Sequence, residues 1–521
     1  MDSAGLSIYC KAESTTAIRA DIARASVSRR RLLAMLFAGV ALPVWAEAPT
    51  QSPRPKLRAT PKPKADIDGA AKSLIKSAKL GGVVGYVVAD LTNGRVRESE
   101  NADVALPPAS VCKAVTSLFA LETLGVGHRF STRVMRVGAL TDGTIEGDLV
   151  LAGGGDPTFD TDKLGDLVAA LAASGVRQVT GRFIAYAGAL PERDRIAADQ
   201  PEQVGYNPAI SGLMLNFNRV NFEWKRANDE WLIQMNATGE RFVPGVKMAK
   251  MQVVRREGPL FTYTAGIPSA ETALDNWTVA AGALGKDGSR WLPVRHPAIY
   301  VAEVFATLCA AQGITLPAAE IVQILPAGAQ TIVQHDSEAL PELLRKMLKF
   351  STNLTAEAVG LTASGAGTLQ GSAATMTDWA RRRFGITGTF GDHSGLGPKS
   401  QITAADMMQV MIAARRSKTG AALQGLMREM GITGPDGKER KGSKVRVHAK
   451  SGTMNFVSNL SGYIAGPASA SLAFAIFTAD ISRRSALSME AREDPPGGSA
   501  WTKRSRRMQA QLIARWAENY L

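Results

Sequence analysis

The sequence predicts a mixed α and β fold in which both ends of the chain build one domain of sheet and helices, and a β-rich segment interrupts it. Two observations predict this class. Residues 66–133 and the stretch after Leu340 combine apolar strand patterns with helical ones. From Val134 to about Glu320 the chain shows short strands, many glycines and repeated turn signals instead. A length of 521 residues, 45% of them hydrophobic, agrees with several folded domains.

The N-terminus indicates export. Arginines at 29–31 stand before a short apolar stretch that ends at Trp45, and small residues follow. This order is typical of a secretory signal, so we predict a signal peptide at 1–46 and a secreted or periplasmic protein. The residues leave open whether a twin-arginine or a Sec signal is present. Residues 47–65, rich in proline and basic residues, predict an extended tether.

The folded part begins near Asp66 with a strand at Gly85–Ala89 and a hairpin turn at Asn93-Gly94. After two prolines, Val111, Val115 and Leu118 repeat at helical spacing. The other predicted elements are helices ending near 350 and at 404–416, 421–430 and 503–521, and strands at 460–464 and 471–478.

Charge and cysteine content exclude several classes of protein. The net charge is +14, but half of this excess lies in residues 1–65, and no nucleic-acid motif accompanies it. A basic surface suits at most a peripheral contact with membrane or cell wall. Cys112 and Cys309 remain after signal cleavage, too few for a disulfide scaffold, and the helical pattern around Cys112 predicts a buried free thiol. The five histidines never pair at metal-ligand spacing, so no metal is expected.

Three short motifs follow one another along the chain, and they carry the chemistry. They are Ser110-Val111-Cys112-Lys113, Ser351-Thr352-Asn353 and Lys450-Ser451-Gly452-Thr453. The ordered set Ser-x-x-Lys, Ser-x-Asn and Lys-Thr-Gly is found in penicillin-binding proteins and class A β-lactamases.

Each motif also occurs elsewhere in this chain by chance. Ser73 and Lys76 fit the first motif, Ser99 opens a second Ser-x-Asn, and Lys418-Thr419-Gly420 fits the third. Ser73 falls within a predicted helix, Ser99 breaks the order, and no strand follows Lys418. We therefore predict that these three are not part of a site.

The motif spacing has a chemical reason. A serine hydroxyl needs a neighbouring base, and residues i and i+3 share a helix face, so Lys113 reaches Ser110. Burial and the nearby cation of Lys450 are expected to lower the pKa of Lys113, which makes its neutral form accessible. The backbone N–H groups of Ser110 and Thr453 suit an oxyanion hole.

The remaining motif residues suit substrate binding and proton transfer. Ser351 is expected to bridge the two lysines as a proton relay, and the Asn353 amide to hold a substrate peptide group. Lys450 and the Ser451 hydroxyl suit a terminal carboxylate, and Gly452 keeps the strand clear for the substrate. His448 alternates with Lys450 along the same strand and is a candidate for the border of the site.

Beyond these motifs, the chain resembles the D-alanyl-D-alanine carboxypeptidase/endopeptidase family, peptidase S13, from about Asp66 to Leu521. Four departures concern substrate preference: Thr352 replaces Asp, Ser451 replaces Thr, His393 replaces Gly and Gly397 replaces Ser. The matching segments are Pro108-Ala109-Ser110, Gly147-Asp148-Leu149, Gly153-Gly154-Gly155-Asp156-Pro157-Thr158, Leu215-Asn216-Phe217-Asn218, Ala356-Glu357, Asp392-His393-Ser394-Gly395-Leu396 and Asn459-Leu460-Ser461-Gly462-Tyr463.

The resemblance implies a transpeptidase-like, serine β-lactamase-like α/β (α+β) domain that is discontinuous and carries two nested β-rich inserted domains. The implied boundaries are 66–138 and 331–521 for the catalytic domain, 139–210 and 296–330 for the first inserted domain, and 211–295 for the nested one. The 241 positions between Ser110 and Ser351 leave room for them.

The implied reaction is acyl transfer on peptidoglycan stem peptides through a Ser110 acyl-enzyme, without metal or organic cofactor, with β-lactam antibiotics as covalent inhibitors. The balance of carboxypeptidase and endopeptidase activity stays open. One alternative is a serine β-lactamase, but the chain lacks the Glu-x-x-Leu-Asn segment of class A enzymes. The other is a catalytically silent wall-binding module, which the intact motifs disfavour.

Overall fold

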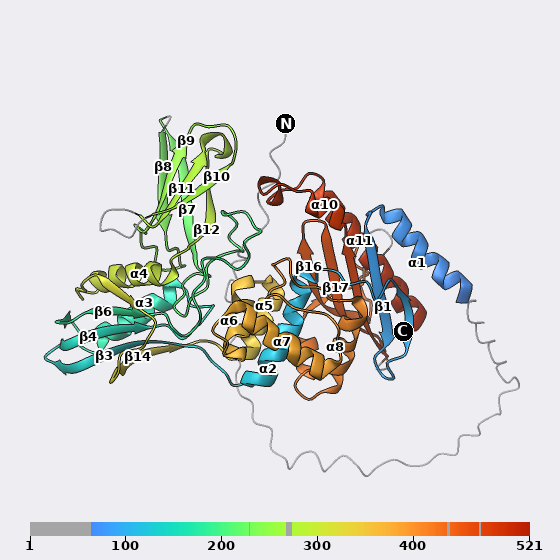
Figure 1. The fold of residues 1–521 in the computed structure, drawn as a ribbon, viewed down its shortest axis with the longest axis horizontal. Helices are drawn as coiled ribbons and strands as arrows, with labels where there is room; N and C mark the ends of the chain where they lie inside the picture. The colour runs from blue at the N-terminus through green and yellow to red at the C-terminus, as the bar shows by residue number, and fades with distance from the viewer. Residues whose placement is uncertain (1–63, 229, 267–272, 435–437, 468–469) are drawn as a thin grey trace, which may run out of the picture. The chain divides into compact units, whose positions relative to one another are not determined.

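A computed structural model describes residues 64–228, 230–266, 273–434, 438–467 and 470–521 (Figure 1). The predicted signal peptide and all but the last two residues of the predicted tether lie outside these ranges. In the described ranges, none of the helices is both long and apolar enough for a membrane span.

The two ends of the chain meet in one six-stranded antiparallel sheet, as the sequence predicts. Its strand order is β15-β16-β17-β18-β1-β2, so the first strand pairs with the last. The register of that pair matches Val83 with Ala479 and Asp90 with Leu472. The strands are β1 Val83–Asp90, β2 Val96–Glu100, β15 Arg428–Met430, β16 Arg446–Met454, β17 Val457–Ala465 and β18 Ser471–Ala479.

Helices cover both faces of this sheet (Figure 1). On β1, Val87 and Ala89 belong to one core, whereas Tyr86 and Val88 belong to the other, because successive side chains of a strand point to opposite faces. The first core contains side chains of α2 Cys112–Leu124, α5 Leu340–Phe350, α6 Asn353–Ser364, α7 Leu369–Phe384, α8 Ala404–Arg416 and α9 Ala421–Leu426. The second contains α1 Lys64–Ala78 and α11 Gly498–Tyr520, and the short α10 Ile481–Ser485 precedes α11.

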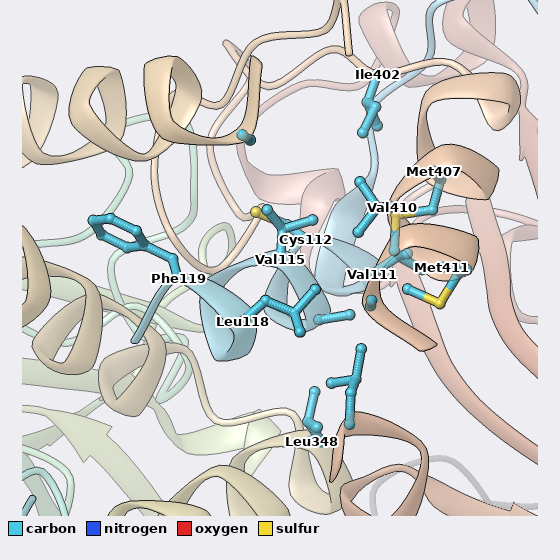
Figure 2. Packing of buried hydrophobic residues seen from close by; sticks show 14 of the residues in the cluster. Val111, Cys112, Val115, Leu118, Phe119, Leu348, Ile402, Met407, Val410 and Met411 are labelled. Atoms are coloured by element: carbon cyan, nitrogen blue, oxygen red, sulfur yellow. The ribbon is translucent and has the colours of Figure 1, made fainter. Parts of the chain in front are cut away.

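The helix α2 lies inside the first core. Residues 112–121 are all buried, including the polar side chains of Lys113, Thr116 and Ser117. Figure 2 shows its side chains packed among those of neighbouring helices. Burying one Val, Leu or Phe contributes about 1.5–3 kcal/mol, so this packing holds the helix, and the residues at its start, firmly in place. The labelled residues are Val111, Cys112, Val115, Leu118, Phe119, Leu348, Ile402, Met407, Val410 and Met411.

A separate five-stranded sheet, with a short sixth strand beside it, follows α2 in the chain. Its order is β13-β6-β4-β3-β14, with β5 next to β4. Between β6 and β13 in the chain, residues 219–293 form two separate three-stranded sheets, β12-β7-β8 and β10-β11-β9. The strands of the first sheet are β3 Ser131–Thr141, β4 Thr144–Ala152, β5 Gln178–Val179, β6 Phe183–Tyr186, β13 Ala319–Val322 and β14 Gln330–Asp336. Those of the two smaller sheets are β7 Arg219–Ala227, β8 Glu230–Asn236, β9 Ala249–Val254, β10 Phe261–Ala265, β11 Asp275–Ala280 and β12 Asp287–Pro293.

The β-rich interruption and its nesting confirm the predicted fold class. The predicted domain boundaries stay predictions; the divisions at 138/139 and 330/331 fall within β3 and β14, which pair with each other. The segment also holds two helices that the sequence analysis missed, α3 Thr161–Ala173 and α4 Pro297–Ala311. The signal for α3 was present: Leu164, Leu167, Val168 and Leu171 recur at helical spacing, and the Asp160 side chain accepts a hydrogen bond from the N–H of Lys163 at the start of that helix.

Two other local predictions were also wrong at their ends. The helix expected at 421–430 ends at Leu426, because residues 428–430 form β15 and pair with β16, and strand pairing outweighs local helix propensity. The last helix begins at Gly498 rather than near 503. Cys112 and Cys309 are both buried and free, which confirms the prediction for Cys112.

Candidate active site

Ser110 lies in a single turn of 3-10 helix, residues 109–111, directly before α2. Two contacts fix this turn from the sheet side. The Asn459 side-chain amide donates to the carbonyls of Pro107 at 2.8 Å and Pro108 at 3.0 Å. A Cβ on Gly452 would lie 2.7 Å from the Pro108 carbonyl oxygen and 2.9 Å from the Ser110 nitrogen. Only glycine therefore lets β16 approach the turn that carries Ser110.

Lys113 is fully buried one turn later, and its Nζ contacts three acceptors. These are Ser110 Oγ at 2.8 Å, Asn353 Oδ1 at 2.8 Å and the carbonyl oxygen of Ser394 at 2.9 Å. The two carbonyl-type oxygens can only accept, whereas a serine hydroxyl can also donate. A neutral amine has two N–H bonds for these two oxygens, so its lone pair points at the Ser110 hydroxyl. This is the geometry of a general base beside its nucleophile.

Burial lowers the pKa of Lys113 from its ordinary value to about 8, against the opposing effects of Cys112, Glu357 and Asp392. The predicted contribution of Lys450 to this shift is not found. The repulsion between the two lysines lowers the pKa of Lys450 instead: burial and then the charge of Lys113 hold that pKa well below its usual range. Desolvation therefore makes the neutral form of Lys113 accessible near neutral pH.

Ser351 ends α5 in the left-handed backbone region, with φ of 60°. Its hydroxyl accepts a hydrogen bond from Lys450 Nζ at 3.0 Å, and Lys450 also donates to the Ser451 carbonyl at 2.7 Å. Between Ser351 and Lys113, which both lie in the described residues, the structure places no hydrogen bond. Of the two hydrogen bonds that the predicted relay needs, the structure contains the one between Ser351 and Lys450. A left-handed backbone is strained for serine, so this placement is held by the surrounding structure.

Asn353, the first residue of α6, has both ends of its amide occupied. Its Oδ1 accepts from Lys113, and its Nδ2 donates to the carbonyl oxygen of Tyr206 at 2.9 Å. The predicted role of this amide in holding substrate stays a prediction, and its contact with Tyr206 of the inserted segment is a finding of the structure. No local pattern could have indicated this contact, because 147 positions separate the two residues.

The third motif lies on the open part of β16. Strand β15 pairs only with residues 447–449, so the far side of residues 450–454 has no strand partner in the described part of the sheet. Ser451 and Thr453 are exposed there. The Arg506 guanidinium on α11 donates to Thr453 Oγ1 at 3.3 Å and places a cation at this edge, which the sequence analysis missed. His448 lies two residues before Lys450 on β16. Its ring Nε2 lies 4.0 Å from the Glu429 carboxylate on β15, not beside a motif residue.

Two buried carboxyl groups lie beside Lys113. Asp392 accepts hydrogen bonds from the backbone N–H groups of Gly395 and Gly397, both at 2.6 Å, so it orders its own loop. Glu357 on α6 was quoted only as part of a resemblance, and its proximity to the base was not foreseen. His393 in the same loop is fully buried, contacts Ser372 through Nε2 at 2.6 Å, and has its pKa lowered to about 3 by burial, so its ring is neutral.

The chance motif matches lie elsewhere, as predicted. Ser73 is within α1, Ser99 is on β2, and Lys418 is in the turn between α8 and α9. None of the three serves the cluster around Ser110.

Comparisons with known proteins agree with this geometry. The sequence model of the D-Ala-D-Ala carboxypeptidase 3 (S13) family matches residues 68–494. A D-alanyl-D-alanine carboxypeptidase of Actinomadura sp. is 28% identical over 442 residues, 76% of this chain and 77% of the relative. D-alanyl-D-alanine carboxypeptidase DacB of Haemophilus influenzae is 22% identical over 76% of this chain and 85% of the relative.

Solved structures show the same fold. The crystal structure of penicillin binding protein 4 (dacB) from Haemophilus influenzae has a TM-score of 0.67 at 19% identity, covering 85% of this chain and 99% of that one. A second structure of that protein, complexed with a β-lactam, has a TM-score of 0.65 at 18% identity and covers 86% of this chain and 99% of that one. The described fold is therefore that of a penicillin-binding protein with inserted sheets.

Proposed function

The chain belongs to the D-Ala-D-Ala carboxypeptidase 3 (S13) family, and from this premise we propose which of its residues carry the reaction. It is a serine-type D-Ala-D-Ala carboxypeptidase. The observation that carries the assignment of residues is the buried amine of Lys113, which lies 2.8 Å from the Ser110 hydroxyl and has Asn353 Oδ1 and the Ser394 carbonyl as its two other acceptors. We assign Ser110 as the nucleophile and Lys113 as its base.

Acylation follows from this geometry. Lys113 Nζ takes the proton of the Ser110 hydroxyl as Oγ attacks the carbonyl carbon of the D-Ala–D-Ala bond. The resulting oxyanion lies between the N–H groups of Ser110 and Thr453, where β16 approaches the turn at Gly452. The C–N bond then breaks, and the leaving amine takes a proton that returns from Lys113. A second route for this proton, through Ser351 and Lys450, would require a further hydrogen bond from Ser351 to Lys113 or to the leaving amine, because Ser351 contacts only Lys450 of the two lysines.

Deacylation uses water, which returns the acyl group as a carboxylic acid and the proton to Ser110. The two carboxyl groups near the site are poorly suited to activate this water for a penicilloyl ester. Glu357 and Asp392 are buried, and all four of their oxygens accept backbone N–H groups. A penicillin adduct is therefore expected to persist, and this favours a peptidase over a β-lactamase.

Substrate binding is proposed at the open edge of β16. A stem peptide would add there as a further strand, and its terminal carboxylate would face Ser451, Thr453 and Arg506. Because the pKa of Lys450 is held well below its usual range, the exposed guanidinium is the cation best placed to attract this carboxylate. Binding also requires the Asn353 amide to exchange its Tyr206 contact for the substrate's peptide group.

Peptidoglycan stem peptides as substrates and β-lactams as covalent inhibitors complete the proposal. Export through the predicted signal at 1–46 would place the enzyme with this substrate, in the periplasm or outside the cell. The experiment has two readouts on the full chain: release of free D-Ala from a peptide ending in D-Ala-D-Ala, and a covalent penicillin adduct measured by intact mass. Release and adduct together support the proposal. Rapid turnover of penicillin without release of D-Ala would favour the β-lactamase alternative, and neither reaction would favour the silent module.

A further inference from the structure

Glu357 has an unusual environment for an acidic residue. It lies on α6, whose other residues carry no charge, and its side chain is fully buried. Its Oε2 accepts the backbone N–H of His393 at 3.0 Å, and its Oε1 accepts that of Ser394 at 2.9 Å. A buried carboxylate is costly unless both oxygens are hydrogen-bonded, and here both are.

The carbonyl that these contacts position is the one that Lys113 uses. Ser394 donates its backbone N–H to Glu357, and the Ser394 carbonyl oxygen accepts a hydrogen bond from Lys113 Nζ at 2.9 Å. The hydroxyl of Thr116 on α2 donates to the neighbouring His393 carbonyl at 2.7 Å, so both residues are held from two helices. Asp392 accepts the N–H groups of Gly395 and Gly397 in the same loop. Of the two buried acids, Glu357 is the one that holds the residue whose carbonyl contacts Lys113.

We propose that Glu357 is a positioning residue for the general base: it holds the Ser394 residue whose carbonyl orients the amine of Lys113, and its ionised form stabilises the protonated form of that amine. This inference rests on the proposed function, because it assumes that Lys113 accepts the proton of Ser110. It adds a residue outside the three motifs to the machinery of acylation.

The charges around Glu357 give the direction of the expected effect. Lys113 and Cys112 of α2 face it from one side, and Asp392 and His393 from the other. Burial raises the pKa of the Cys112 thiol, and His393 is neutral, so Lys113 is the cation-forming group here. Burial and then the charge of Asp392 raise the pKa of Glu357 to about 8, while its hydrogen bonds with Ser394 and His393 and the charge of Lys113 oppose this rise. The charge of Glu357 raises the pKa of Lys113. Removing that charge must move the pKa of Lys113 downwards.

The test is the pH dependence of acylation by a penicillin, measured on the full chain from pH 5.5 to 9.5 for wild type and Glu357→Gln. A Gln cannot accept at both positions, so the Ser394 carbonyl loses one of its supports. We expect the acylation rate at the optimum to fall at least about tenfold. We also expect the acidic limb of the profile to move to lower pH by roughly half a unit or more, because the neutral amine becomes easier to form.

Asp406 provides the matched control. It is buried in the same domain and accepts the backbone N–H groups of Thr387 at 2.9 Å and Gly388 at 3.1 Å, but no motif residue contacts it. Asp406→Asn is expected to lower stability without moving the acidic limb. An unmoved limb in folded Glu357→Gln, with a rate no lower than that of Asp406→Asn, would overturn the inference.

Glu357→Asp decides the matter if the Gln variant does not fold. It keeps the charge but withdraws the carboxylate by one methylene, so acylation should slow at least about tenfold while the acidic limb stays in place. A wild-type rate in Glu357→Asp would contradict the positioning role. A wild-type chain that is never acylated at Ser110 would instead overturn the proposed function, and this inference with it.

Discussion

The chain contains the pattern Ser-x-x-Lys at two helices, and the two copies differ in how far their side chains are buried. On α1, Ser73 and Lys76 are both exposed to solvent. At the start of α2, Ser110 is half-buried and Lys113 is completely buried. Solvent leaves a lysine protonated near neutral pH, whereas burial lowers the pKa of Lys113 to about 8. The sequence pattern thus supplies the spacing of serine and lysine, and burial in the surrounding core lowers the lysine pKa enough for the amine to act as a base.

The largest expected effect separates the two serines. Ser110→Ala should abolish penicillin labelling and lower the rate of D-Ala release by on the order of 10⁵-fold or more, because the acyl-enzyme cannot form. Ser73→Ala should leave both unchanged, and thermal unfolding should show that both variants are folded. Labelling that survives in Ser110→Ala and vanishes in Ser73→Ala would reverse the assignment.

The two lysines should differ next. Lys113→Met removes the base and should slow acylation about 10²–10⁴-fold, measured by stopped-flow mixing with a chromogenic β-lactam. Lys76→Met, on the exposed face of α1, should acylate at the wild-type rate. Equal losses in the two variants would mean that burial of Lys113 has no bearing on its reactivity.

The glycines of the two Lys-(Ser/Thr)-Gly segments extend the comparison. Gly452→Ala places a Cβ against the backbone of Pro108 and Ser110, so acylation should fall on the order of 10²-fold as the nucleophile shifts. Gly420→Ala also clashes, with the Ala414 carbonyl at 2.5 Å and the Ser417 hydroxyl at 2.7 Å, but with no motif residue. It should lower the melting temperature and leave acylation by the folded protein intact.

The pH dependence has a definite sign. The pKa of Lys113 is lowered in the folded chain, so between about pH 8 and pH 10.4 the unfolded chain binds a proton that the folded one does not. Wild type should therefore gain stability relative to Lys113→Met as the pH rises through this window, in chemical unfolding curves. A difference that stays constant over this range would show that the amine is not desolvated.

The smallest expected effect concerns substrate binding. Arg506→Ala should raise KM about two- to fivefold for a peptide with a free terminal carboxylate and leave kcat unchanged, as expected for an exposed ionic contact. The same peptide with a terminal amide should be insensitive. Arg507→Ala, exposed on the same helix, is the control, and an equal effect of both variants would indicate only a general attraction by the basic helix.

The sequence was sufficient for the fold class and for the three motifs that the structure brings together, because both can be recognised from local patterns. Strand alternation, helical spacing and the order of three motifs do not require a structure. The contacts that tune the site could not be predicted, since they join distant segments. Lys113 meets Asn353 and Ser394 across 240 and 281 positions. The same reason explains β15, where pairing with β16 overrode a helical pattern.

The most direct test of this account is to locate the acyl group. The full chain is incubated with benzylpenicillin, its intact mass is followed over time, and the adduct is mapped by peptide mass spectrometry, while a parallel sample is given a peptide ending in D-Ala-D-Ala. The account predicts one adduct on Ser110 that lasts minutes or longer, and repeated release of D-Ala from the peptide. An adduct on Ser73, or rapid turnover of penicillin without release of D-Ala, would contradict it.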